Sequence, residues 1–161
     1  NCFSLEDLAQ RFPNAGFIWL RRDVREAAES DLAARYSVHG DALIWNSATP
    51  ANVDALRKLP PEGQVLENQY EFSRAISEAA AGLAPGRFAE VWYEDFIAWP
   101  DGVTQRLAAS FDPLKGMQPA SLPAFKMLRS AVLSEADRAG IASHMARDPA
   151  RWQALSWPRP Q

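Results

Sequence analysis

The sequence predicts a three-layer α/β fold, rich in helix, in which parallel strands are joined by crossover helices. Two short apolar runs have the pattern of buried strands: residues 17–20 (FIWL) and 88–93 (FAEVWY). Helical patterns lie between and after these runs, which is the order that parallel strands require. A chain of 161 residues, 47% hydrophobic and 23% charged, fits one soluble globular domain.

The first part of the chain is expected to combine one strand with two helices and a long loop. Ser4 is the candidate N-cap of a short helix, and Asp23 with Glu26 has the form of a capping box for a longer one. Residues 37–63 are poorly patterned, and we expect a loop there, of a length that is usually functional or mobile. The helices predicted in this part are residues 4–10, 24–36 and 53–58.

The rest of the chain is expected to be mostly helical. Residues 65–83 carry a broad apolar face and form the strongest predicted helix, which ends at Pro85 and Gly86. Ser134, with Asp137 three residues later, is typical of a helix start. Further helices are predicted over residues 103–111, 121–132 and 134–147.

Two strands do not make an independent sheet, because parallel strands need neighbours and cover on both faces. We therefore expect that strands are missing from the front, or that a partner chain completes the sheet. The start at Asn1 rather than Met agrees with a missing N-terminal segment. Residues 1–161 are then one partial domain, with a helical C-terminal part over 113–161.

Composition and charge exclude several kinds of partner. A net charge of −3 and a pI near 5.4 argue against nucleic acid. The sequence contains no apolar run near the roughly 20 residues that cross a bilayer. The single cysteine, Cys2, cannot form an internal disulfide, which favours a cytoplasmic location. His39 and His144 are too isolated for a metal site, and His144 is expected to be an exposed helix residue.

The segment from Arg21 to Ser30 is the first candidate site. Arg22 stands where a buried strand ends and a helix begins, and in open α/β sheets ligands bind at that edge. A helix N-terminus favours an anion, and Ser30 lies two turns on, on the face that Asp23 and Ala27 share. An arginine fork and a hydroxyl would suit a phosphate monoester. The alternative is that small residues here only pack on the sheet, with Ser30 bonded to the Glu26 carbonyl.

The second candidate is the strand end Tyr93-Glu94-Asp95. Adjacent acids there could bind a metal or act as acid and base. The interpretation that we favour is structural, with one acid capping the next segment or pairing with an arginine.

Together these segments resemble the sulfotransferases that use 3′-phosphoadenylyl sulfate (PAPS), and most closely the bacterial trehalose-type members. FPNAGFIWLRRDVREAAESDLAARY is similar to the family's strand–helix segment for the 3′-phosphate, in which a serine follows an arginine by eight residues, as Ser30 follows Arg22. AEVWYEDFIAWPDGVTQRLAASFD is similar to a later segment, a strand running into Tyr-Glu-Asp. The resemblance covers about residues 3–113 and implies a P-loop-like nucleotide-binding fold.

The resemblance implies that PAPS is the sulfuryl donor, that adenosine 3′,5′-bisphosphate is the product, and that no metal is needed. It assigns Arg22 and Ser30 to the 3′-phosphate, and Tyr70 to the adenine. The family's final basic segment closes over the 3′-phosphate, and its candidate residues in this sequence are Lys126 and Arg129. Lys115 is a further candidate. The P-loop-like turn and the catalytic base would lie in the missing segment, and His39 is a second candidate base. The acceptor would be a small molecule, glycan or lipid that offers a hydroxyl.

Two alternatives stay open. One is a non-catalytic sulfotransferase-like module that binds a partner. The other is a different nucleotide-binding enzyme of the P-loop kinase type, although the sequence shows no glycine-rich loop.

Overall fold

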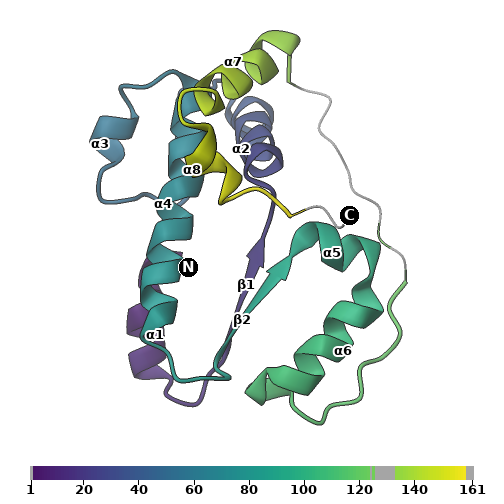
Figure 1. Cartoon of the computed structure of the whole chain (residues 1–161). Coiled ribbons are helices and arrows are strands. Elements are labelled where there is room, and N and C mark those ends of the chain that lie inside the picture. Colours follow the sequence, from purple (N-terminus) through teal and green to yellow (C-terminus); the bar gives the residue numbers. More distant parts are fainter. Residues whose placement is uncertain (1, 124, 126–132, 159–161) are drawn as a thin grey trace. The chain divides into compact units, whose positions relative to one another are not determined.

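The computed structural model describes residues 2–123, 125 and 133–158 and shows a helix-rich α/β protein (Figure 1). Two short 3₁₀ turns, Cys2–Ser4 and Asp112–Leu114, accompany the longer elements. The strands are β1 (Phe17–Arg21) and β2 (Phe88–Trp92). The helices are α1 (Leu5–Arg11), α2 (Val24–His39), α3 (Val53–Leu56), α4 (Pro61–Ala81), α5 (Tyr93–Ala98), α6 (Pro100–Ser110), α7 (Glu135–Met145) and α8 (Pro149–Gln153).

The chain divides into two compact units, which we describe separately. The sheet unit comprises residues 1–22 and 75–127, and the helical unit comprises residues 23–74 and 128–161. The boundary falls between Arg22 and Asp23, and again within α4. The organisation as a single domain stays a prediction.

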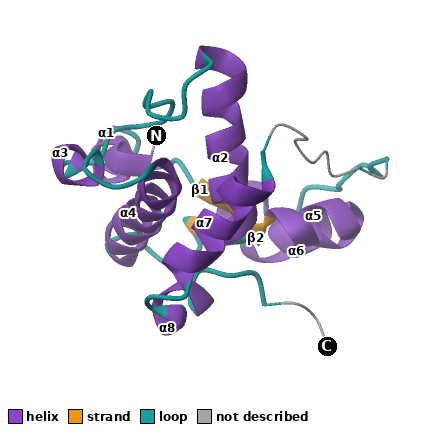
Figure 2. Cartoon of the chain, turned by 90° about the horizontal axis from the view of Figure 1, so that it is seen from above, coloured by secondary structure: helices purple, strands orange, loops and turns teal. Residues whose placement is uncertain are grey.

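The sheet unit is built on two parallel strands in register, from Phe17 opposite Phe88 to Arg21 opposite Trp92. Side chains alternate between the two faces of a strand. On one face Val91 is buried, whereas Leu20 beside it is 54% exposed. Leu5, Val103 and Phe111 are also buried in this unit. Figure 2 shows the two strands next to each other, seen nearly end-on.

The helical unit has the larger hydrophobic core. Helices α2, α4, α7 and α8 all contribute to it, and Trp152 of α8 is only 2% exposed. The buried core residues are Val24, Ala28, Leu32, Ala33, Ala42, Val65, Leu66, Leu133, Ile141 and Trp152. The last helices of the chain are therefore part of this core.

The structure confirms both predicted strands and their parallel pairing, but β2 ends at Trp92 and Tyr93, predicted as its last residue, begins α5. Of the predicted caps, Asp23 accepts from the backbone N–H groups of Arg25 and Glu26, and Ser134 and Asp137 form a full capping box. Ser4 is the N-cap residue of α1, as predicted, but its side chain makes no capping hydrogen bond and a 3₁₀ turn precedes the helix.

Helix boundaries also differ from those predicted, most clearly in α2, α4 and α6. Helix α2 continues to His39, since Gly40 supplies the left-handed C-cap (φ 70°). Helix α4 begins at Pro61, because proline fits the first turn of a helix, and α6 begins at Pro100 for the same reason. The helix predicted over residues 121–132 lies mostly outside the described residues, and residues 121–123 are not helical.

Candidate functional site

The carboxyl ends of β1 and β2 bring the two sequence motifs together. Arg21 pairs with Trp92, so Arg22 and Tyr93 come next at the same edge of the sheet. The guanidinium carbon of Arg22 lies 5.2 Å from the centre of the Tyr93 ring, which is cation–π distance. The strand–arginine motif and the Tyr-Glu-Asp motif are thus in contact within the sheet unit.

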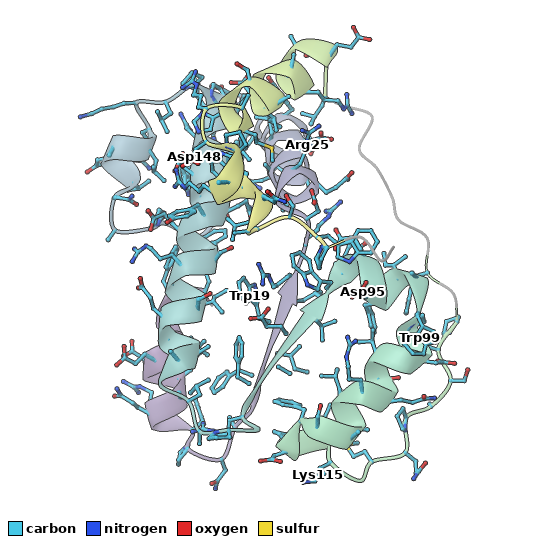
Figure 3. All side chains as sticks on the ribbon, in the orientation of Figure 1. Trp19, Arg25, Asp95, Trp99, Lys115 and Asp148 are labelled. Atoms are coloured by element: carbon cyan, nitrogen blue, oxygen red, sulfur yellow. The ribbon has the colours of Figure 1, made fainter. Side chains whose placement is uncertain are left out.

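The neighbouring Arg21 has a different surrounding. Its guanidinium carbon lies 4.4 Å from the ring centres of both Trp19 and Trp92, and Nη1 donates to Glu90 at 2.9 Å. Only 16% of the Arg21 side chain is exposed. Figure 3 labels Trp19 on β1, on the face of the sheet that it shares with Arg21. Arg21 therefore braces this face, and Arg22 is the arginine at the edge where ligands bind in such sheets.

The N-terminus of α2 already has an anion, the carboxylate of Asp23. Its Oδ1 accepts from Arg25 N–H at 3.1 Å and Glu26 N–H at 3.3 Å, and its Oδ2 accepts from Trp157 N–H at 3.1 Å. The Asp23 carboxylate thus compensates the partial positive charge at the N-terminus of α2. A phosphate beside this segment would depend on side chains rather than on these two amides.

Ser30 is exposed on α2, in the helical unit. Among the described residues nothing is hydrogen-bonded to its hydroxyl, and the alternative bond to the Glu26 carbonyl is not formed. Arg22 and Ser30 belong to different units. The prediction that both bind the 3′-phosphate therefore rests on their spacing in the sequence.

Tyr70 packs in the helical unit. Its ring lies 3.6 Å from the guanidinium carbon of Arg151 and makes an edge contact with Trp152, with centroids 6.4 Å apart. One face of Tyr70 is thus covered, and an adenine would have to stack on the other. The role of Tyr70 at an adenine stays a prediction.

The predicted acids lie at the start of α5. Glu94 is 6% exposed, Asp95 is half-buried, and both lie in the first turn, where negative charge is favourable. Within the described part of the chain, no three His, Cys, Asp or Glu side chains gather as a metal site. Burial raises the pKa of the Cys2 thiol, which disfavours its nucleophilic form.

The remaining candidates are scattered. His39 is exposed, and its Nε2 lies 2.9 Å from Asn46 Oδ1. Lys115 lies in the turn after α6, at the opposite end of that helix from Asp95 (Figure 3). Lys126 and Arg129 lie outside the described residues.

The expectation that His144 is exposed is wrong. Only 12% of its side chain is exposed, and its Nε2 lies 3.0 Å from Glu67 Oε1. Arg151 binds the same carboxylate with two nitrogens, at 3.1 and 2.6 Å. We name Glu67, His144 and Arg151 the Glu67 cluster. Sequence analysis missed it because its members are far apart in the chain and no local pattern links them.

The sequence over residues 1–113, which includes both strands and their ends, identifies the family. Residues 1–113 match the model of the sulfotransferase family, and the chain belongs to that family. The match includes both Arg22 and Tyr93. No curated protein and no solved structure matches the chain significantly. Among the described helices, none combines the length and the apolar character that crossing a membrane requires.

Proposed function

We propose that this protein transfers a sulfuryl group from PAPS to an acceptor hydroxyl, within a P-loop-like fold and without a metal. The observation that supports this most is the contact between Arg22 and Tyr93, because it joins the two segments that resemble PAPS-dependent enzymes. The family match, which covers both residues, supports sulfuryl transfer in general.

The chemistry of Arg22 and Ser30, taken residue by residue, suits a phosphate monoester. Arg22 carries a permanent charge and a planar fork, and the exposed Ser30 hydroxyl can donate a hydrogen bond. We assign both to the 3′-phosphate of the nucleotide. This phosphate is remote from the sulfur, so the two residues position the nucleotide and do not take part in the chemical step.

PAPS supplies an activated sulfuryl group. The acceptor oxygen attacks the sulfur in line, the bond from sulfur to the phosphate oxygen breaks, and adenosine 3′,5′-bisphosphate leaves. A base takes the proton of the acceptor hydroxyl. We place this base outside the residues described above, in an N-terminal segment or partner chain that completes the sheet.

The acceptor is proposed to be a sugar, a lipid or a small alcohol. The loop between α2 and α4, residues 41–60, is proposed to line the acceptor side, because long loops held by a helical scaffold commonly carry specificity. The amino-acid composition of this loop does not distinguish between these acceptors.

Calorimetric titration of the full-length protein with two nucleotides tests this function. Adenosine 3′,5′-bisphosphate should bind at least tenfold more tightly than adenosine 5′-phosphate, because only the former carries the 3′-phosphate. Equal affinities for the two nucleotides would overturn the proposal.

A further inference from the structure

Two buried polar side chains close the base of the 41–60 loop. Arg35 of α2 is fully buried, and Gln64, in the first turn of α4, is 1% exposed. Arg35 Nη1 donates to Gln64 Oε1 at 2.8 Å. These side chains therefore connect the helix that precedes the loop to the helix that follows it.

Each of the two side chains also holds one end of the loop. Arg35 Nη1 donates to the Ala42 carbonyl at 3.0 Å, and its guanidinium carbon lies 5.0 Å from the Trp45 ring centre. Gln64 Nε2 donates to the Leu59 carbonyl at 2.9 Å and to the Arg57 carbonyl at 3.4 Å. The pair thus reaches both ends of the loop.

Burying a guanidinium is costly, and burial lowers the pKa of Arg35, an effect that the nearby Asp31 carboxylate offsets in part. Well-packed apolar side chains often replace a buried charge without loss of stability. What an apolar pair could not supply here is the set of hydrogen bonds to loop carbonyls. The distinctive contribution of these side chains is therefore to the conformation of the loop.

We propose that Arg35 and Gln64 are positioning residues that hold the 41–60 loop in one conformation. We call the pair the Arg35–Gln64 latch. Only the link from this loop to the acceptor rests on the function proposed above. The latch itself depends on contacts within the helical unit.

Amide hydrogen exchange of the full-length protein, resolved by residue, tests the latch end by end. The backbone N–H groups of Arg57, Lys58 and Leu59 report on the far end, and those of Leu43 and Ile44 on the near end. Gln64→Glu keeps an oxygen for Arg35 but removes the donor to Arg57 and Leu59. It should speed exchange at the far end about tenfold and leave the near end unchanged.

Arg35→Lys keeps the charge but not the planar fork, and it should speed exchange chiefly at Leu43 and Ile44. The matched control is Asn52→Ala, which removes the exposed hydrogen bond from Asn52 of this loop to Glu71 of α4 and should leave both ends unchanged. Uniform acceleration along the whole chain would show a purely structural role and overturn the latch. Unchanged exchange at the far end in Gln64→Glu would overturn it as well.

Titration with adenosine 3′,5′-bisphosphate keeps the two proposals separate. Gln64→Glu should bind this nucleotide as the wild type does, since we assign Gln64 no contact with it. If the wild type fails to bind, the proposed function falls while the exchange result still decides the latch.

Discussion

The guanidinium carbon of Arg22 lies 5.2 Å from the centre of the Tyr93 ring, where two parallel strands end side by side. The two residues are far apart in the sequence, and each belongs to a segment that resembles PAPS-dependent sulfotransferases. The parallel register puts them next to each other, because Arg21 pairs with Trp92 one step earlier.

Replacing the Tyr93 ring should weaken nucleotide binding modestly. A cation–π contact at a partly exposed site is worth about 0.5–1 kcal/mol, so Tyr93→Leu should raise the Kd for adenosine 3′,5′-bisphosphate roughly two- to fivefold. Tyr93→Phe keeps the ring and should bind as the wild type does. Equal losses in the two variants, measured by calorimetry, would assign the effect to the hydroxyl instead.

Activity should depend on completing the sheet. Ile18 and Leu20 are 46% and 54% exposed on β1, and among the described residues only β2 pairs with it. Two strands cannot bury both of their faces. We expect the isolated 161-residue chain to transfer no sulfuryl group from radiolabelled PAPS above background, and turnover by that chain alone would refute this.

The Glu67 cluster should contribute to the stability of the helical unit. The Glu67 and Arg151 side chains are 16% and 28% exposed, and charged hydrogen bonds of this kind contribute about 1.5–3 kcal/mol. Glu67→Gln should lower the free energy of unfolding in urea by an amount in that range. The control is Asp54→Asn, since the Asp54–Arg57 pair is 3.8 Å long and largely exposed and should contribute nothing measurable. Similar effects of the two substitutions would contradict a special role of the cluster.

Stability should fall in acid partly through Asp137. Burial raises the pKa of this carboxyl, but hydrogen bonds from Ser134 and Tyr36 outweigh burial and leave the pKa below its usual 3.8. A lowered folded-state pKa contributes stability that is present above about pH 4 and is lost as the pH falls through the folded-state value. Asp137→Asn should therefore be less stable than the wild type at pH 7.

The difference between these two proteins should shrink as the pH is lowered from 4 toward 2, as measured by urea unfolding at each pH. Tyr36→Phe removes one of the hydrogen bonds, at 2.9 Å, so the folded-state pKa of Asp137 should rise toward its usual value and this variant should lose less stability between pH 4 and pH 2 than the wild type does. A constant difference between wild type and Asp137→Asn at every pH would show that Asp137 acts through packing alone.

Local sequence patterns predicted the strands and helix caps, because these depend on residues that are close together in the chain. The apolar runs that became β1 and β2 and the caps at Asp23 and Ser134 are confirmed. Contacts between distant residues were not predictable in this way. His144 looked like a surface residue because its partner, Glu67, lies on another helix. The environments of Arg21 and Arg22 also depend on how the strands pair: Arg21 lies against Trp19 of β1 and Trp92 of β2, whereas Arg22 lies against Tyr93, the residue that follows β2.

Calorimetry on variants of the full-length protein tests most directly whether Arg22 and Ser30 bind the 3′-phosphate. Arg22→Ala removes a charged hydrogen-bonding group worth about 1.5–3 kcal/mol, so adenosine 3′,5′-bisphosphate should bind roughly ten- to more than a hundredfold more weakly. Ser30→Ala should cost about 0.5–1.5 kcal/mol. Arg25→Ala, which removes an exposed arginine from the same helix start, should change nothing.

Each variant is titrated with adenosine 3′,5′-bisphosphate and with adenosine 5′-phosphate. We predict that the losses of affinity in Arg22→Ala and Ser30→Ala disappear with adenosine 5′-phosphate, which lacks the group that these residues bind. Equal losses for both nucleotides would mean that Arg22 only supports the fold, and that the 3′-phosphate site lies elsewhere.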